Sequence, residues 1–370
     1  MSLPLPQPPS SSHEEGFNEA PLFMTDPSLP VVALTLGDPA GIGSELIARL
    51  LSRTERVAAA NVVLIGDPWL WEEGQRVAGL RVATTLVASF AAVRARPDAA
   101  TPAFLAVDTV LPEQVHRAQP EAPGGASVLA VLDLCMDAAL AHEIDAICFA
   151  PLNKYAMKLG GLKHEDELHH FAQHLGVTGY FCEFNTLEGL WTSRVSSHVP
   201  LKDAPKYLDQ GRIIDAATLI YRSLQANGVA RPRVAVAGFN PHNGDGGTCG
   251  REEIDIIEPA VRSLNARGIE VVGPYPADTI FLKARDGELD AIVTMYHDQG
   301  QIAIKLMGFS KGVTVQGGLP VPITTPAHGT AYDIAGQGRA NVDATANAFD
   351  IACRMGRAYR AGQSLFGQPQ

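Results

Sequence analysis

The sequence predicts an α/β protein built on a doubly wound sheet. Short apolar runs that read as buried strands occur at 31–36, 61–66 and 146–150, and a long helical pattern rich in alanine and leucine covers 125–141. Strands that alternate with helices of ten or more residues are typical of sheets with helices on both faces. The chain has 370 residues, of which 46% are apolar and 19% charged. It is therefore long enough for one large domain or two linked ones with a substantial core.

The first predicted unit is a strand followed by a tight turn and a helix. A buried strand at 31–36 turns through 37–43 into a helix for which Ser44 is a plausible N-cap. The glycines of this turn suggest a phosphate cradle, but G-D-P-A-G-I-G is not G-x-G-x-x-G and no G-K-[ST] follows. We therefore expect a tight turn with close backbone approach rather than a Rossmann site. Further elements follow as strands at 61–66, 146–151 and 291–294 and a closing helix at 343–358.

Composition excludes several classes of protein. Lys and Arg number 29 against 40 Asp and Glu, a net charge of −11, and an acidic chain without a basic block is a poor nucleic-acid binder. No apolar run approaches the roughly 20 residues that span a bilayer. Residues 1–30 lack the pattern of a signal peptide, and we expect a disordered extension there. Five scattered cysteines without a C-x-x-C predict free thiols and a cytoplasmic location.

Three histidines each follow a strand-like segment and stand beside turn residues. His297 follows the apolar run 291–294, His242 follows 234–237, and His198 follows Leu190 and Trp191. Ligands in open α/β sheets sit beyond the carboxyl ends of strands. Three neutral imidazoles with one open position suit a catalytic ion of the zinc type. Their separations of 44 and 55 residues mean that only the fold could bring them together, so three independent polar histidines remained an alternative.

Six motifs resemble those of the 4-hydroxythreonine-4-phosphate dehydrogenase family, in family order. They are TLGDPAGIGSEL (35–46), SSHVPLKD (196–203), FNPHNGDGG (239–247), PADTIF (276–281), MYHDQG (295–300) and HGTAYDIAGQG (328–338). The resemblance implies that His198, His242 and His297 bind a divalent metal, with His297 contributed by the partner subunit of a homodimer. Zinc, cobalt or nickel is then expected, with magnesium or manganese as alternatives.

The run 328–341 also resembles the cofactor loop of isopropylmalate and isocitrate dehydrogenases. That resemblance implies an isopropylmalate dehydrogenase-like, non-Rossmann fold of two α/β/α subdomains with the active site in the cleft between them. The cofactor-side subdomain would comprise 31–155 plus 315–370, and 156–314 would carry the dimer contacts and the metal and substrate site. NAD is the implied cofactor, because Asp333 matches an aspartate of NAD-dependent members and would repel a 2′-phosphate. The other implied cofactor-binding residues are His328, Gly329, Thr330, Ala331 and Asn341.

The remaining catalytic candidates carry two interpretations each. Lys305 is either a snorkelling surface lysine or, as the resemblance implies, a substrate-binding residue that binds an anion or transfers a proton. Asp298 and Asp278 either orient loops or support the imidazoles and relay protons. Four further histidines at 164, 169, 170 and 174 form either the solvated face of a helix or, through the i, i+4 pair His170 and His174, a second metal site.

The segment 161–171 departs from the family pattern. Phosphate-handling members have a histidine and a threonine that bind the phosphorylated substrate, and an ungapped alignment puts Glu167 and Leu168 at those places. Thr314 and Ile323 replace a family asparagine and arginine. A gap before His169 would instead bring His164 to the phosphate position. Since a phosphate dianion requires cationic or N–H partners, this pocket predicts a substrate without phosphate.

We therefore expect an NAD- and metal-dependent dehydrogenase that oxidises a secondary alcohol beside a carboxylate, with loss of carbon dioxide. A carboxylated cis-dihydrodiol fits, as in the related terephthalate dihydrodiol dehydrogenases. One alternative is 4-hydroxythreonine-4-phosphate dehydrogenase itself, in pyridoxal phosphate biosynthesis. Another is a binding protein that kept the fold and lost turnover. The partners would be a small-molecule substrate and a second copy of the chain, with neither nucleic acid nor membrane.

Overall fold

The structure, a computed structural model, describes residues 28–96, 100–187, 189–308 and 311–363. Most of the predicted extension at 1–30 lies outside the described residues. Pro30 belongs to the fold, because it is buried and its carbonyl accepts a hydrogen bond from the Asn61 N–H at 2.9 Å. The ordered fold therefore begins slightly before residue 31.

Within the described residues, twelve strands form one mixed sheet in the order β3-β4-β2-β1-β5-β12-β11-β6-β7-β10-β8-β9. The strands are β1 (Val31–Thr35), β2 (Asn61–Gly66), β3 (Thr85–Val87), β4 (Ala103–Ala106), β5 (Ala146–Phe149), β6 (Cys182–Leu187), β7 (Leu190–Arg194), β8 (Val234–Ala237), β9 (Val271–Tyr275), β10 (Ala291–Thr294), β11 (Val313–Gly317) and β12 (Ile323–Pro326). The central strands are apolar and β-branched because helices cover them; every residue of β1 is buried.

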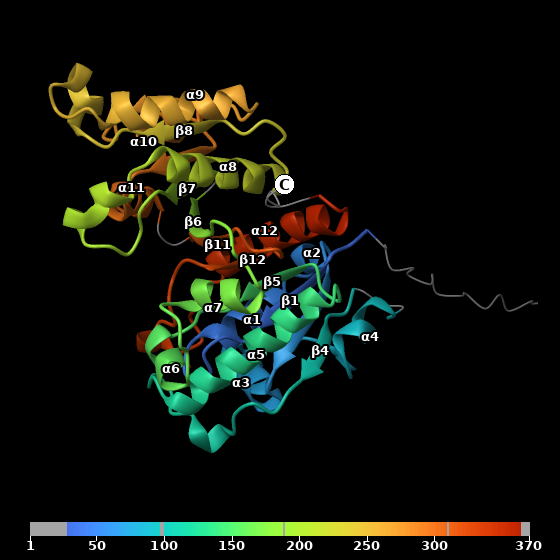
Figure 1. Cartoon of the computed structure of the whole chain (residues 1–370). Helices are drawn as coiled ribbons and strands as arrows, with labels where there is room; N and C mark the ends of the chain where they lie inside the picture. Colours follow the sequence, from blue (N-terminus) through green and yellow to red (C-terminus); the bar gives the residue numbers. More distant parts are fainter. Residues whose placement is uncertain (1–27, 97–99, 188, 309–310, 364–370) are drawn as a thin grey trace, which may run out of the picture.

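Helices cover both lobes of the sheet (Figure 1). They are α1 (Gly43–Leu51), α2 (Thr54–Val57), α3 (Pro68–Ala78), α4 (Phe90–Arg94), α5 (Ala122–Leu140), α6 (Lys154–Leu159), α7 (Glu167–His174), α8 (Gln210–Ala226), α9 (Glu258–Ala266), α10 (Ile280–Arg285), α11 (His297–Gly308) and α12 (Asp343–Arg360). By length and composition α5 could cross a membrane, but 56% of its apolar window is buried inside this fold, as in a core helix.

The sheet has two halves that meet where β12 pairs with β11. Strands β1 to β5 and β12 form one half, and β6 to β11 form the other. β11 runs antiparallel to both β12 and β6, and β6 antiparallel to β7, so the sheet is not the all-parallel Rossmann type. The predicted subdomain boundaries stay a prediction; α6 and α7, assigned to the middle unit, pack with α5 in the first half.

The turn after β1 behaves as predicted, but its cap does not. Gly37 has φ +70°, and a Cβ there would lie 2.7 Å from the Pro151 carbonyl oxygen, so close backbone approach requires glycine. The prediction that Ser44 is the N-cap of this helix is wrong. The helix already begins at Gly43, with Ile42 as the cap residue, because the Ile42 N–H donates to the Thr330 carbonyl at 3.2 Å.

Candidate active site

A cavity of about 390 Å³ opens where the two halves of the sheet meet. It is bounded by the loop after β5, the start of α7, strands β6, β7 and β11, helix α11 and the loop after β12. Its chemically significant lining residues are Lys154, Glu167, Glu183, Asn185, Arg194, His198, His297, Gln301, Lys305, Thr314, His328 and Gly329. The predicted position of the active site, a cleft between two subdomains, stays a prediction, and this cavity is the candidate for it.

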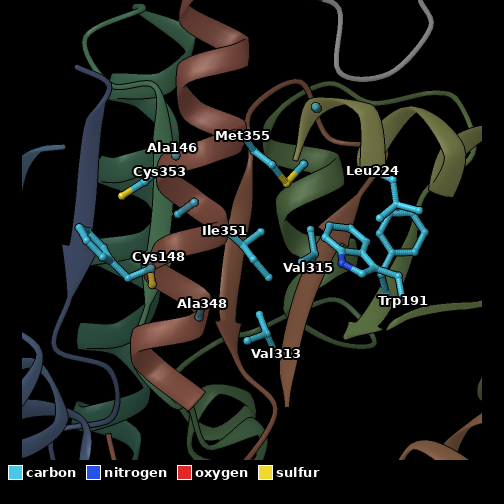
Figure 2. Close-up of a cluster of buried hydrophobic side chains, with 14 of the residues drawn as sticks. Ala146, Cys148, Trp191, Leu224, Val313, Val315, Ala348, Ile351, Cys353 and Met355 are labelled. Atoms are coloured by element: carbon cyan, nitrogen blue, oxygen red, sulfur yellow. The ribbon is translucent and has the colours of Figure 1, made fainter. Parts of the chain in front are cut away.

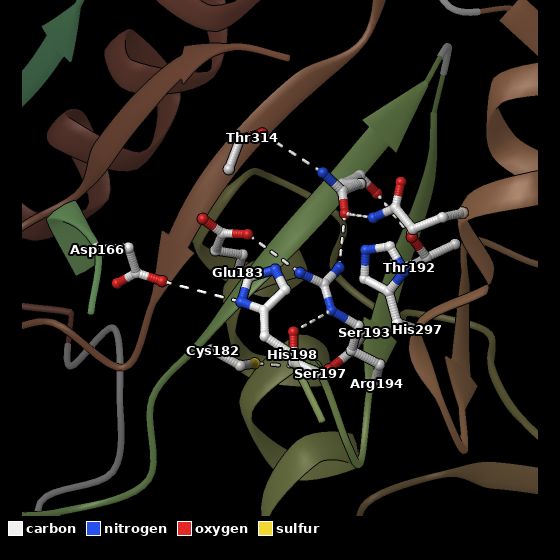
Figure 3. Close-up of polar contacts among 12 residues, drawn as sticks. Asp166, Cys182, Glu183, Thr192, Ser193, Arg194, Ser197, His198, His297 and Thr314 are labelled. Carbon is white, nitrogen blue, oxygen red and sulfur yellow. Dashed lines mark hydrogen bonds and ion pairs between the residues drawn. The ribbon is translucent and has the colours of Figure 1, made fainter. Parts of the chain in front are cut away.

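A buried arginine at the end of β7 organises the cavity floor. Arg194 is 6% exposed and ion-pairs with Glu183 at 3.0 Å. Its other nitrogens donate to Asn185 Oδ1 at 2.8 Å and to Ser197 Oγ at 2.9 Å (Figure 3). A buried guanidinium with every side of its fork engaged has a fixed position. Arg194 therefore fixes the segment that carries His198.

Two of the three predicted metal ligands lie together in one chain. The rings of His198 and His297 have centroids 5.7 Å apart, and both line the cavity. Asp298 Oδ1 lies 2.8 Å from His297 Nδ1, which leaves Nε2 of His297 to face a metal. Glu165 and Asp166 lie 3.8 and 4.0 Å from His198 Nδ1.

His242 lies apart from this pair. Among the described residues, the three imidazoles do not form a group whose ligand nitrogens all lie within 4.8 Å of one another, and His242 does not line the cavity. The resemblance implied that His297 crosses from the partner, whereas this chain's own His297 lies beside His198. Which histidine a second subunit supplies remains a prediction.

The loop that carries His242 is strained and held by a buried carboxylate. Residues 242–246 all have positive φ, including the non-glycine residues His242, Asn243 and Asp245. Glu253 accepts hydrogen bonds from the backbone N–H groups of Phe239 and Asn240, both at 2.7 Å. Burial alone would raise the pKa of Glu253, but these hydrogen bonds outweigh it and hold the pKa below its usual value.

The altered segment places an ion pair in the cavity. Glu167 lines the cavity as predicted, and its Oε2 lies 3.2 Å from Lys154 Nζ. Burial raises the pKa of Glu167, and the Lys154 charge offsets this only in part. Burial alone would lower the pKa of Lys154, but the nearby carboxylates, Glu167 first, give a net increase. The positive charge of Lys154 is therefore partly neutralised within the cavity.

Two of the predicted substrate contacts are wrong. Leu168 is 4% exposed and Ile323 fully buried, and both pack in the hydrophobic core behind the cavity. They face away because Leu168 follows Glu167 on α7 and turns toward α5, while Ile323 lies on the core face of β12. Thr314 does line the cavity, where its hydroxyl accepts a hydrogen bond from Asn185 Nδ2 at 3.4 Å.

Of the three remaining catalytic candidates, one lines the cavity and two do not. Lys305 lines the cavity from α11, and its role in binding an anion or transferring a proton stays a prediction. Asp298 is 70% exposed and acts on His297 rather than lining the cavity. Asp278 is exposed in the turn before α10 and does not line the cavity of this chain. A catalytic role for Asp278 therefore finds no support within one subunit.

The predicted cofactor loop continues from the cavity to α1. His328 and Gly329 line the cavity, and Nε2 of His328 is buried without a hydrogen-bond partner. Thr330 is buried against the first turn. Tyr332 donates to Asp38 Oδ2 at 2.6 Å, and burial raises the pKa of Asp38 despite that bond. Ala331 has a positive φ of +44°, and the Asp333 side chain is exposed. The Asn341 side chain accepts a hydrogen bond from the Asp343 N–H at 2.9 Å.

Sequence reasoning missed Lys154, Arg194, Glu183 and Asn185 as cavity residues. One signal was present for Lys154, which follows a buried strand and a proline in a polar loop. Another was the arginine at the end of the otherwise uncharged strand β7. A charged residue at the carboxyl end of a buried strand is a candidate site residue, and both positions meet that criterion.

Comparison with known proteins shows that the chain is a dehydrogenase acting on CH–OH groups. The chain belongs to the family of the pyridoxal phosphate biosynthetic protein PdxA, whose sequence profile matches residues 58–352. A Pseudomonas aeruginosa protein provisionally named 4-hydroxythreonine-4-phosphate dehydrogenase 2 is 54% identical over 90% of this chain and 99% of its own. D-threonate 4-phosphate dehydrogenase of Pectobacterium atrosepticum is 34% identical over 88% and 99%. The predicted family resemblance is thus confirmed.

Solved structures agree with the fold. The 4-hydroxythreonine-4-phosphate dehydrogenase of Klebsiella pneumoniae superposes with a TM-score of 0.77 at 33% identity, covering 89% of this chain and 98% of that one. A terephthalate 1,2-cis-dihydrodiol dehydrogenase from Burkholderia xenovorans gives 0.64 at 29% identity, covering 88% and 98%. The relatives named for the phosphorylated substrate are therefore closer than the dihydrodiol dehydrogenase, the reverse of the preference drawn from the sequence.

Proposed function

We propose that this protein is a cytoplasmic NAD- and metal-dependent dehydrogenase that oxidises the secondary alcohol of a small phosphorylated hydroxy acid. The reference substrate is 4-hydroxythreonine 4-phosphate. The observation that carries this proposal is the 54% identity, over almost the full length of both chains, to a relative named for that substrate. The phosphorylated hydroxy acid thus replaces the carboxylated cis-dihydrodiol, which the sequence favoured, as the leading candidate substrate.

A divalent metal fits the histidine pair. His198 and His297 lie side by side in the cavity, and Asp298 on Nδ1 of His297 favours the tautomer that presents Nε2. When bound, such an ion would act as a Lewis acid on the substrate oxygen. The protein's own contribution is to hold the substrate between this pair and Lys305, which is positioned to bind a carboxylate.

NAD fits the loop 328–341. His328 offers a buried ring nitrogen without a partner at the cavity, where a bound group could satisfy it. Asp333 is exposed on the loop and free to accept hydrogen bonds from ribose hydroxyls. The loop would position the nicotinamide ring, which carries the redox chemistry.

The preference for NAD has a direct test. We expect Asp333→Lys to reduce the ratio of catalytic efficiency with NAD to that with NADP, because the carboxylate that repels a 2′-phosphate becomes a cation. Steady-state rates with each cofactor measure this ratio. Glu55→Lys, a charge change of the same size at an exposed residue outside the loop 328–341, is the matched control. A parent enzyme that uses both cofactors equally well would refute the assignment.

A second candidate substrate is a carboxylated cis-dihydrodiol without phosphate. The observation that favours it is Glu167, a buried carboxylate in the cavity whose pairing with Lys154 reduces the positive charge available to a phosphate dianion. Oxidation of such a substrate would yield a keto acid prone to lose carbon dioxide.

One assay separates the candidates. Reduced-cofactor absorbance is followed with 4-hydroxythreonine 4-phosphate, D-threonate 4-phosphate and a carboxylated cis-dihydrodiol, each with and without a strong chelator. Higher catalytic efficiency on a phosphorylated substrate, abolished by the chelator, supports the main proposal. Higher efficiency on the dihydrodiol supports the second candidate. Cofactor binding without turnover of any of the three would favour a binding protein of the same fold.

We propose a homodimer in which the third imidazole comes from the partner. Mixing two inactive variants tests this, since complementation needs an interface-spanning site. If His242 crosses, His198→Ala mixed with His242→Ala should regain about a quarter of wild-type activity, because half of the dimers are hybrids with one intact site. His198→Ala mixed with His297→Ala should then stay inactive. If His297 crosses instead, as the family resemblance implies, this second mixture should recover.

A further inference from the structure

Helices α5 and α7 present matched pairs of ligand-type side chains to each other, away from the cavity lining. Asp133 and Asp137 are four residues apart on α5, and His170 and His174 are four residues apart on α7. Residues at this spacing share one face of a helix. His170 Nε2 lies 2.7 Å from Asp133 Oδ1, and His174 Nδ1 lies 3.4 Å from the same oxygen.

We propose that Asp133, His170 and His174 form a second divalent-metal site, separate from the catalytic cavity. One ligand atom from each of the three residues lies within 4.8 Å of the other two. In a tetrahedral zinc site, bonds of about 2.0–2.1 Å place neighbouring ligand atoms about 3.3 Å apart. The two distances to Asp133 Oδ1 lie on either side of that value, and the shorter one is a hydrogen bond that a bound ion would replace.

The mixed nitrogen and oxygen ligand set indicates the kind of ion. Two imidazoles with one carboxylate suit zinc, cobalt or nickel better than magnesium or calcium, which prefer oxygen. His164, whose ring lies 5.8 Å from the His170 ring, does not belong to the group of ligand atoms within 4.8 Å of one another, so water is the expected fourth ligand. Asp137 Oδ1, 2.8 Å from His174 Nε2, would then orient a coordinating His174 through its other nitrogen.

The burial of the histidines argues against a merely solvated helix face. The side chains of His170 and His174 are only 17% and 22% exposed, because both turn onto α5 rather than outward. None of the three proposed ligands lines the catalytic cavity. An ion here would join α5 to α7, the helix whose first residue, Glu167, does line it. Its role would be to hold α7 in place.

The test compares zinc content and heat stability across variants. The protein is loaded with zinc, freed of excess metal, and analysed for zinc per chain and for melting temperature with and without zinc. We expect the double variant His170→Ala/His174→Ala to hold one zinc per chain fewer than wild type and to lose a zinc-dependent rise in melting temperature. His142→Asn should behave as wild type, since His142 follows the α5 C-cap residue Ala141, does not belong to the cluster, and Asn tolerates its positive φ.

Two further arms keep the outcome decisive. Asp133→Asn keeps the shape of the side chain and carries the same expectation if the double histidine variant fails to fold. The comparison repeated in a His198→Ala background isolates this site from the catalytic metal, so that loss of the catalytic ion cannot imitate it. Equal zinc content and equal zinc-dependent melting shifts in wild type, the double histidine variant and Asp133→Asn would overturn the proposal.

Discussion

At the level of single residues, Arg194 shows how a buried charge can fix a site. Its guanidinium engages Glu183, Asn185 and Ser197 at once, and removal of it would leave the partly buried Glu183 carboxylate without its ion-pair partner. We expect Arg194→Met to lower the free energy of unfolding by about 3–5 kcal/mol, as measured by urea denaturation. Adding Glu183→Gln should restore part of that loss. Arg233→Met, which breaks an exposed ion pair with Asp290, should cost at most about 1 kcal/mol.

Glu167 provides a second prediction at this scale, through pH. Its pKa is raised in the folded state, so its contribution to stability is present below the ordinary value of 4.5 and is lost as pH rises through the folded pKa. Glu167→Gln, which mimics the protonated acid, should therefore gain stability relative to wild type at pH 8 and lose that gain near pH 4.5. Urea denaturation at both pH values measures the difference, with the exposed Glu55→Gln as control. A gain that does not change with pH would contradict the assignment.

At the level of elements, the loop 238–247 depends on a carboxylate from the following π-helical turn, Glu253–Ile257. In Glu253→Gln the amide oxygen can still accept from the N–H groups of Phe239 and Asn240, but the amide nitrogen replaces the oxygen that accepts from Asn240 Nδ2. An unsatisfied buried donor costs about 1–3 kcal/mol. We expect a loss of this size at pH 7, together with lower kcat because His242 is no longer held. Glu252→Gln, which removes a carboxylate with a single side-chain contact, is the neighbouring control.

The same carboxylate predicts an acid dependence of opposite sign to that of Glu167. The pKa of Glu253 is lowered in the folded state, so its stabilising contribution is present above the ordinary value and is lost as pH falls through the folded pKa. The stability difference between wild type and Glu253→Gln should therefore shrink in acid. A constant difference from pH 7 to pH 3.5 would show that the charge plays no part.

At the level of the whole molecule, one hydrophobic core joins both halves of the sheet. Helix α12 packs Ile351 and Met355 between β5 on one side and β11, Trp191 and Leu224 on the other (Figure 2). Because this core crosses the junction, we expect the two halves to unfold in one cooperative transition. Trp191 reports on the second half, while Trp69 and Trp71 report on the first.

Ile351→Ala tests that coupling. The substitution should cost about 2–5 kcal/mol, the usual range for an aliphatic core truncation. In a variant that keeps Trp191 alone, the fluorescence midpoint and the far-ultraviolet circular dichroism midpoint should fall together. Midpoints that separate would show that the halves unfold independently. Leu306→Ala, which removes a side chain that is 83% exposed, serves as the control.

The sequence by itself determined the α/β class and the non-Rossmann first turn. These features are local, because strand periodicity and turn glycines can be read within a few positions. The family resemblance assigned roles to His198, His297, His328, Lys305 and Glu167; all five line the cavity, and their roles stay predictions. The motif series also determined the family, which the comparisons confirm. It did not determine the substrate, because the preference drawn from one altered segment ran against the closer relatives.

Only the tertiary structure decided which distant residues meet. It paired His198 with His297 but left His242 apart, turned Leu168 and Ile323 into the core, and matched Lys154 to Glu167. These outcomes depend on strand order and on the face that each helix presents, and neither is encoded in local periodicity. The side chains that face each other across α5 and α7 are a further example. The spacing of His170 and His174 suggested a metal site, but only the packing of α7 on α5 shows that Asp133 lies beside them.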